Sequence, residues 1–403
     1  MREKNNGFKQ KLQQVKAHLD EHQIDGWLLY DFHRQNHQAV QFLEIPPSTH
    51  LTRRLFYWIP KEGEPLKLVH AVEPFVLDHL PGDKKVYHTW QSFESSLKEL
   101  ILGKKVIAME YSPKSRIPYI SLVDGGILDL IKEYGVHVVS SGAFLQYFTC
   151  VWTERQLELH LEAASHLDEI AEKTWLWISQ QLKQNKTVSE YDIQQLILKE
   201  MKDRNCEMEG LPICAIGAHT ADPHYTPSAH KSSHVQKGDL ILIDLWCKKN
   251  APEAVYADIT RVAVAACCPS AHQQEVFDVV RQAQRKATDF IRTAIEKGHS
   301  IKGYEVDRLC RKEIEEAGYA EYFIHRTGHN IHIETHGPGA NLDSFETFDE
   351  RPLIAQTCFS IEPGIYLPGQ FGVRLEYDVY IHKTNRIQIT GGIQDNLICL
   401  GDF

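Results

Sequence analysis

The fold of this chain is decided by residues 240–264, which read LILIDLWCKKNAPEAVYADITRVAV. Two apolar runs flank a short polar stretch that contains Pro252, and this pattern predicts a β-hairpin. Each predicted strand carries one acid, Asp244 or Asp258, among apolar neighbours. A strand as apolar as the first is typical of burial on both faces, so an ionised Asp244 there is costly. Two carboxylates on neighbouring strands also repel each other unless a cation or a proton lies between them.

A second pair of β-like segments near the C-terminal end has the same character. Residues 359–366 carry Glu362, and residues 372–381 carry Glu376, each among aliphatic neighbours. With the two aspartates, this region therefore holds four acids at positions where the pattern predicts core.

Ordinary structural explanations remain open for single members of this set. Asp258 could pair with Arg261 or cap a turn, and Glu376 could pair with Arg374 two residues away. Four such acids in two matching pairs favour a shared site over separate local ion pairs.

The region after residue 153 contains an internal repeat. Apolar side chains recur at helical spacing over residues 153–178 and again over residues 272–297. Each predicted long helix is followed by a shorter one, and TVSEYDI at residues 187–193 aligns with SIKGYEV at residues 300–306, 113 residues later. This duplication predicts a site where strands from the two halves meet.

A histidine-rich segment precedes the two glutamates. Residues 325–336 contain four histidines, at positions 325, 329, 332 and 336. Their spacing fits one face of a helix, but the nearby glycines, Gly328 among them, favour a loop and a short strand. The spacing alone does not decide which imidazole faces the acids.

Four carboxylates and one imidazole form a donor set for two divalent cations. Mixed oxygen and nitrogen donors suit Mn²⁺, Co²⁺, Fe²⁺ or Zn²⁺ better than an all-thiolate zinc site would. Paired ions lower the pKa of a water between them and stabilise the oxyanion that forms after attack. This chemistry predicts hydrolysis.

Residues 1–150 show a different pattern, in which short β-like runs alternate with helical stretches. Strands are predicted at residues 26–30, 55–59, 66–69, 105–109 and 136–139, and helices at residues 8–22, 93–101 and 122–134. The alternation predicts a small α/β domain. It contains no cluster of candidate catalytic residues.

Composition excludes several classes of protein. A net charge of -10 without a basic stripe argues against nucleic acid as a partner. No apolar run approaches the roughly 18–20 residues that span a bilayer, and the polar N-terminal stretch lacks a signal-peptide core, so we expect a cytoplasmic protein without a membrane span. The nine cysteines show no CxxC motif and are expected to be reduced.

The sequence resembles the pita-bread metallopeptidases, the family of aminopeptidase P, prolidase, methionine aminopeptidase and metal-free creatinase. The resemblance is specific over residues 153–403, where IEPGIY surrounds Glu362 and GVRLE ends at Glu376. Residues 1–150 resemble the N-terminal domain of the creatinase and prolidase branch. The resemblance implies an α+β fold. A small α/β domain at residues 1–150 would precede a duplicated catalytic domain at residues 153–403, with a curved, mainly antiparallel sheet backed by helices.

The resemblance also implies roles for individual residues. The family's ordered metal ligands fall here on Asp244, Asp258, His329, Glu362 and Glu376. Asp258 and Glu376 would bridge two ions, with Mn²⁺ the first choice. Asp244 would hold one ion, and His329 and Glu362 the other. Glu362 would also accept a proton from the attacking water.

Further family positions surround these ligands. His224 matches a substrate-side histidine, and His336 matches the histidine that steadies the tetrahedral intermediate. His325, Tyr366 and Arg374 match substrate-binding positions of the branch that is specific for proline.

Two departures from the family pattern concern the substrate cleft. The gap between Asp244 and Asp258 holds 13 residues, which lengthens the predicted hairpin. Asn330 and His332 replace two family glycines, and they could narrow the cleft or add a polar contact. His332 is therefore predicted to bind substrate.

The resemblance implies an Xaa-Pro peptidase that releases the residue before proline, acting as a homodimer. Two alternatives remain. The altered glycines and the longer hairpin are compatible with a metal-dependent small-molecule amidohydrolase or lyase on the same fold. A non-catalytic peptide-binding module is the other alternative, although such modules usually lose their ligands and none is lost here.

Overall fold

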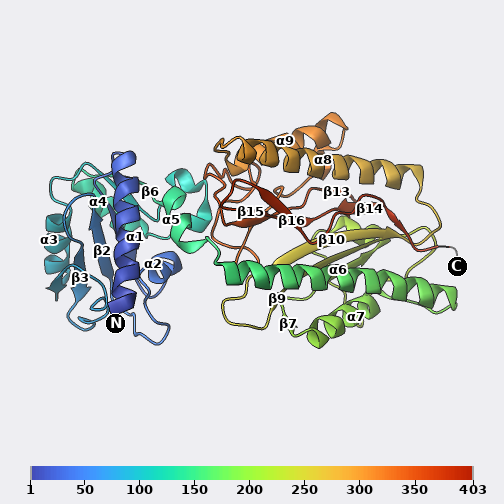
Figure 1. Cartoon of the computed structure of the whole chain (residues 1–403), viewed down its shortest axis with the longest axis horizontal. Helices are drawn as coiled ribbons and strands as arrows, with labels where there is room; N and C mark the ends of the chain where they lie inside the picture. The colour runs from blue at the N-terminus through green and yellow to red at the C-terminus, as the bar shows by residue number, and fades with distance from the viewer. Residues whose placement is uncertain (1, 402–403) are drawn as a thin grey trace. The chain divides into compact units, whose positions relative to one another are not determined.

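The computed structural model describes residues 2–401, with side chains from residue 7 onward (Figure 1). The chain divides into two compact units, Met1–Thr149 and Cys150–Phe403. Within the described range, no helix has both the length and the apolar content that a bilayer crossing needs.

The first unit is a mixed sheet with helices on both faces, and its strand order is β4-β3-β2-β1-β5-β6. The strands are β1 (Gly26–Asp31), β2 (Leu55–Pro60), β3 (Leu66–His70), β4 (Asp83–Tyr87), β5 (Val106–Met109) and β6 (His137–Ser140). The helices are α1 (Arg2–Glu21), α2 (His37–Phe42), α3 (Trp90–Leu100), α4 (Gly125–Glu133) and α5 (Gly142–Thr149), with 3-10 turns at Pro113–Ser115 and Pro118–Ile120.

Side-chain alternation along β1 explains these layers. Trp27 and Leu29 pack with α1, α2 and α5 on one face, whereas Leu28 and Tyr30 pack with α3 and α4 on the other. A strand that is covered on both sides requires a continuous apolar run, because its successive side chains point in opposite directions. The predicted strands of this unit are present. Strand β4 was not predicted, because four of its five side chains are exposed and it lacks the apolar signal.

The second unit consists of long helices packed on mainly antiparallel sheets. The helices are α6 (Glu154–Lys183), α7 (Glu190–Asp203), α8 (Ala271–Glu296) and α9 (Gly303–Glu316), with 3-10 turns at Gly217–Ala221 and Ala320–Tyr322. One sheet has the order β17-β10-β9-β7, with β8 also paired to β9, and another has the order β11-β12-β15-β16. Strands β13 and β14 pair separately. The strands are β7 (Cys206–Glu207), β8 (Ile213–Ile216), β9 (Leu240–Lys249), β10 (Ala257–Val264), β11 (Asn330–Ile331), β12 (Cys358–Ile361), β13 (Gly364–Leu367), β14 (Phe371–Arg374), β15 (Tyr377–Ile381), β16 (Ile387–Thr390) and β17 (Ile398–Cys399).

The two helix pairs of this unit repeat each other. Helices α7 and α9 begin 113 residues apart and end 113 residues apart. The residues just before them, Ser189 and Lys302, each form an isolated β-bridge, to His234 and Pro352 respectively. Helices α6 and α7 lie on one side of the strands, and α8 and α9 lie on the other (Figure 1). The predicted α+β fold with a duplicated second part is confirmed.

Strands β9 and β10 are buried on both faces, and this places the two aspartates. Odd-numbered side chains of β9, such as Ile241, pack with α6 and α7, whereas even-numbered ones, such as Leu242, pack with α8 and the C-terminal strands. Asp244 shares the even-numbered face. In β10, Asp258 shares the face of Val262, which belongs to the same cluster as Leu242. Both acids therefore point toward the C-terminal strands.

The predicted strands around the two glutamates are interrupted. Strand β12 pairs with β15 in one sheet, whereas β13 pairs with β14 in a separate ribbon. Glu362 lies in the gap between β12 and β13, and Glu376 lies in the gap between β14 and β15. The register on both sides of the gap sets Glu362 opposite Glu376.

Candidate metal centre

Asp244 and Asp258 lie on adjacent strands with their side chains on one face. In the β9–β10 register, Asp244 is opposite Thr260 and Asp258 is opposite Trp246. The two acids are only 8% and 5% exposed. Oδ1 of each is buried and has no hydrogen-bond partner among the described residues. A buried carboxylate oxygen without a donor is costly, so the protein alone does not satisfy these acids.

Glu362 and Glu376 bring the acids of the second half to the same place. Glu376 Oε2 accepts a hydrogen bond from Thr260 Oγ1 at 2.6 Å, which joins it to β10. Glu362 Oε1 accepts a hydrogen bond from Ser360 Oγ at 3.2 Å. The two halves of the duplicated unit therefore meet at their acids.

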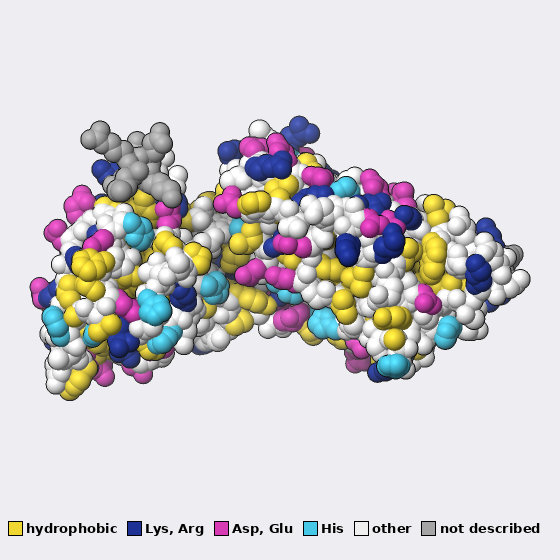
Figure 2. Space-filling view, turned by 90° about the horizontal axis from the view of Figure 1, so that it is seen from below, with side chains coloured by type: hydrophobic (Ala, Val, Ile, Leu, Met, Phe, Trp, Pro, Cys, Tyr) yellow, Lys and Arg dark blue, Asp and Glu magenta, His cyan; other side chains and the backbone are white. Residues whose placement is uncertain are grey.

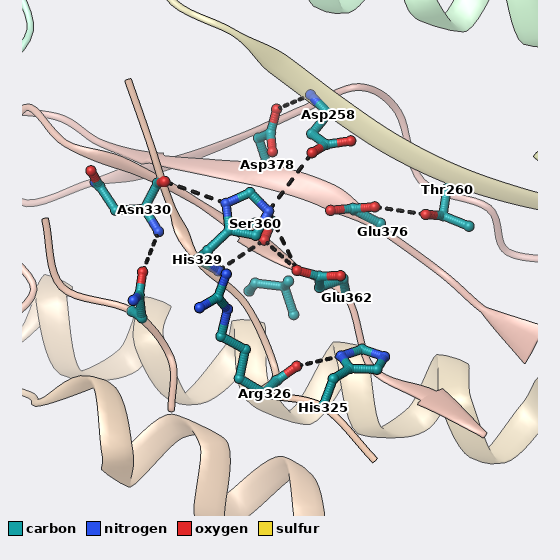
Figure 3. Close-up of polar contacts among 12 residues, drawn as sticks. Asp258, Thr260, His325, Arg326, His329, Asn330, Ser360, Glu362, Glu376 and Asp378 are labelled. Carbon is teal, nitrogen blue, oxygen red and sulfur yellow. Dashed lines mark hydrogen bonds and ion pairs between the residues drawn. The ribbon is translucent and has the colours of Figure 1, made fainter. Parts of the chain in front are cut away.

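His329 adds an imidazole to this acid cluster (Figure 3). Its Nε2 lies 3.7 Å from Asp258 Oδ2 and 3.4 Å from Glu362 Oε1. Its Nδ1 lies 3.3 Å from the backbone oxygen of Asn330. A proton on Nδ1 would therefore leave the Nε2 lone pair facing the carboxylates. One donor atom from each of Asp258, His329 and Glu376 lies within 4.8 Å of the others.

Burial and like charge shift the pKa values of these groups. Burial, followed by the charge of a neighbouring glutamate, raises the pKa of Asp258 and that of Glu376 well above their usual values. Burial raises the pKa of Glu362 to about 7 and lowers that of His329 well below its usual value. A divalent cation would relieve the repulsion and bind the neutral imidazole. Together with the unpaired aspartate oxygens, this donor set fits such a cation.

Arg374 offsets part of the negative charge and begins a hydrogen-bonded chain. Its guanidinium donates to Asp244 Oδ2 at 2.5 Å and to Tyr366 Oη at 2.9 Å. Tyr366 Oη lies 2.7 Å from His325 Nε2, and His325 Nδ1 lies 2.7 Å from the backbone oxygen of Arg326. Because that oxygen accepts the Nδ1 proton, Tyr366 donates its hydroxyl proton to His325. The structure thus joins His325, Tyr366 and Arg374 to Asp244.

The local ion pairs that the sequence left open do not form among the described residues. Arg261 donates to Asp168 at 3.1 Å and to the backbone oxygen of Glu376, rather than to the Asp258 carboxylate. Arg374 does not pair with the Glu376 carboxylate either. Its guanidinium donates to Asp244, and the Glu376 carboxylate accepts from Thr260.

The other predicted histidines differ in their relation to the cluster. The His336 ring packs edge-on against His329 at 4.3 Å between centroids, and burial lowers the pKa of His336 to about 4. His224 is exposed, and it is among the groups that influence the pKa values of Asp244 and His336, which places it on their side of the cluster. His332 is buried, and among the described residues no hydrogen bond or ion pair joins its ring to the five predicted ligands.

Asn330, one of the residues that replace a family glycine, fastens the segment after His336. Its Nδ2 donates to the Cys358 oxygen of β12 at 2.9 Å, and its Oδ1 accepts from the Gly339 N–H at 2.9 Å. A Cβ atom at Gly337 would lie 2.4 Å from Asn330 Oδ1, and one at Gly339 would lie 2.6 Å from Asn330 Cγ. The amide therefore fills space that two glycines leave free.

The lengthened hairpin holds the stretch before His336. Lys248 Nζ donates to the backbone oxygen of Ile333 at 2.9 Å and lies 4.9 Å from the centroid of the Tyr256 ring. The Tyr256 N–H donates to the backbone oxygen of His332 at 2.9 Å. Lys248, near the end of β9, and Tyr256, just before β10, thus hold the chain between Asn330 and His336.

Thr260 and Asp378 are among the polar residues of the centre that were not predicted. Thr260 donates to Glu376 and accepts from Arg374 Nε at 3.0 Å, so it links an acid to a guanidinium. Asp378 is fully buried, and its Oδ2 accepts from the Asp258 N–H at 2.9 Å. Strand alternation is the signal that could have found them, because Thr260 and Asp378 each lie two residues beyond a predicted ligand.

The cluster of carboxylate and imidazole donors from both halves of the duplicated unit is typical of a metal-dependent enzyme. A family model described as Metallopeptidase family M24 matches residues 158–383, which is more than half of the chain. The chain belongs to metallopeptidase family M24.

Individual relatives agree with this family. An Xaa-Pro dipeptidase of Lactobacillus delbrueckii subsp. lactis is 38% identical over 164 residues, which cover 41% of this chain and 40% of the relative. Putative dipeptidase YkvY of Bacillus subtilis (strain 168) is 26% identical over 313 residues, 77% of each chain. For three other curated relatives, the match covers about half of the relative's own length: 48%, 46% and 46%. The solved structure of dipeptidase PepE from Mycobacterium ulcerans shares the fold, with a TM-score of 0.68 at 21% identity over 98% of both chains.

Proposed function

We propose that this chain is an Xaa-Pro peptidase, which releases the residue before proline with two divalent metal ions as cofactors. The observation that carries the proposal is the convergence of donor atoms from Asp258, His329 and Glu376 within 4.8 Å in a member of family M24. Relatives named Xaa-Pro dipeptidase support this choice of substrate.

Five side chains are the proposed metal ligands: Asp244, Asp258, His329, Glu362 and Glu376. Two bound ions, which we propose to be Mn²⁺, would supply a readily deprotonated water and positive charge for the oxyanion. The protein supplies the fixed positions of the donors. Thr260 orients the Glu376 carboxylate at 2.6 Å, and Arg374 orients that of Asp244 at 2.5 Å.

The proton transfers are assigned to side chains around this set. Glu362, whose Oε1 is held by Ser360, accepts a proton from the attacking water at its carboxylate and passes it to the proline nitrogen. His336, packed against His329, donates its N–H to the oxyanion. His224 approaches the substrate from the exposed side.

The remaining assignments follow the family resemblance. Residues 1–150 are assigned to an N-terminal domain of the creatinase and prolidase type, and residues 153–403 to the catalytic domain. A homodimer stays a prediction, which the molar mass from light scattering would test.

Cleavage assays on metal-free protein reconstituted with Mn²⁺ test the proposal. An Xaa-Pro dipeptide and an Xaa-Pro-Pro tripeptide are offered separately, and release of the first residue is followed. We expect cleavage that EDTA abolishes, and the preferred length separates a dipeptidase from an aminopeptidase. Protein that holds two ions but cleaves neither peptide would contradict the proposal in favour of a small-molecule substrate.

A further inference from the structure

A second group of side chains suited to metal binding lies in the first unit, at the C-terminal end of α1. Glu21, the last residue of α1, and His22, in the turn that follows it, lie three and four residues after His18, which brings both near the His18 side chain. One ligand atom from each lies within 4.8 Å of the others. The two imidazole rings are stacked, with centroids 4.0 Å apart and 22° between their planes.

The hydrogen bond of His22 determines which of its nitrogens is available. Its Nδ1 lies 3.0 Å from the backbone oxygen of His18. A carbonyl oxygen only accepts, so Nδ1 carries the proton and Nε2 keeps its lone pair. Metal-binding histidines usually have this arrangement, with one N–H donated to a carbonyl or carboxylate and the other nitrogen on the metal.

His18 is held in place by apolar packing. Its ring centroid lies 4.6 Å from that of Phe144, a side chain that is 1% exposed. Burial, and next the charge of His22, lowers the pKa of His18 to about 4, so its imidazole is neutral near pH 7.

The surroundings favour a cation that keeps part of its water. Glu21 and His22 are exposed and His18 is partly exposed, so water can occupy further coordination positions. Helix α1 ends at Glu21, and the C-terminal end of a helix carries a partial negative charge.

We propose that His18, Glu21 and His22 form a solvent-open site for a borderline divalent cation, with Zn²⁺ as the expected ion. Two imidazole nitrogens and one carboxylate oxygen are a donor set that zinc accepts, with water completing the coordination. None of the three residues belongs to the M24 centre, so the site stands independently of the proposed peptidase activity.

Zinc counting on the full chain tests this site. Metal-stripped protein is dialysed against Zn²⁺, and bound zinc is compared between the wild type, His22→Ala, His22→Gln and His50→Ala. His50 is an exposed histidine outside the group and serves as the matched control. We expect both His22 variants to bind one zinc fewer per chain than the wild type and His50→Ala. Their Mn²⁺-dependent peptide cleavage should be unchanged. Equal zinc binding in all four proteins would overturn the proposal.

Discussion

Glu110 in the first unit and Asp258 in the second are both withdrawn from solvent, 0% and 5% exposed, yet their surroundings are opposite. Glu110 accepts hydrogen bonds from Trp27 Nε1 at 2.6 Å, Asn36 Nδ2 at 2.7 Å and Ser141 Oγ at 3.0 Å. Asp258 has a buried Oδ1 without a partner among the described residues, and its strongest charged neighbours are other acids.

The difference separates a structural acid from a functional one. The three donors offset part of the cost of burying Glu110. They also tie the end of β5 to β1 and to the segments before α2 and α5, where Asn36 is the N-cap of α2. Around Asp258 the protein supplies acids where donors are needed, and a cation resolves this arrangement. A buried acid whose carboxylate keeps an oxygen without a donor, and whose charged neighbours are other acids, is therefore the stronger candidate ligand.

Replacing Asp258 and Glu110 by their amides should give the largest difference between the two acids, measured as kcat/KM. Asp258→Asn removes a ligand charge and should lower kcat/KM by about 10³-fold or more without unfolding the chain. Glu110→Gln is the matched control, and its folded protein should keep the wild-type kcat/KM. Steady-state kinetics with an Xaa-Pro dipeptide, alongside circular dichroism, measure both. Comparable activity in the two variants would remove the distinction between the acids.

Metal removal should destabilise only a protein whose buried acids need the ion. An ion at 100 times its dissociation constant stabilises the folded state by about 2.7 kcal/mol. EDTA should therefore lower the melting temperature of the wild type and of Glu110→Gln, and should change that of Asp258→Asn much less. Calorimetry with and without EDTA measures the three shifts. Equal shifts in all three would mean that Asp258 does not hold metal.

Asn330 resembles Glu110 in that its side-chain amide is held by hydrogen bonds on both of its polar atoms, but it lies next to the proposed metal ligand His329. Asn330→Gly removes its bonds to Cys358 and Gly339, so the segment after His336 should become less ordered. We expect kcat/KM to fall by about tenfold with the metal content unchanged. Kinetics and metal analysis of the same sample check this. If kcat/KM of Asn330→Gly equals that of the wild type, the hydrogen bonds of Asn330 do not position His336.

The smallest expected effect is a pH dependence of stability at Glu110. Burial raises its pKa to about 7, whereas the ordinary value is 4.5. Between these values the folded chain binds a proton that the unfolded chain lacks, so this stabilisation is complete below pH 4.5 and is lost as the pH rises to about 7. The stability difference between the wild type and Glu110→Gln should therefore shrink from pH 5 to pH 8. Denaturant unfolding at both values measures it, and a constant difference would contradict the raised pKa.

The sequence predicted the elements that carry a regular pattern. Helices α6 to α9 and strands β9 and β10 follow from apolar periodicity, and the acids stand out because they interrupt it. The same signal occurs at Glu110, which directly follows the apolar residues of β5. Sequence alone does not separate this residue from Asp244, because the donors that distinguish them come from distant segments.

Other features of the centre depend on contacts that no local pattern contains. Thr260 meets Glu376 across 116 residues of sequence. The role of Asn330 depends on the missing Cβ atoms of Gly337 and Gly339. The spacing of the four histidines also left open which of them faces the acids, and the structure brings His329 there.

The number of Mn²⁺ ions bound per chain is the most direct test of the proposed centre. Equilibrium dialysis of the wild type and Asp258→Asn against Mn²⁺, followed by metal analysis, gives this number. We predict two ions per wild-type chain and fewer in Asp258→Asn. A wild-type chain that binds no Mn²⁺, or an Asp258→Asn variant that binds as much as the wild type, would contradict the account.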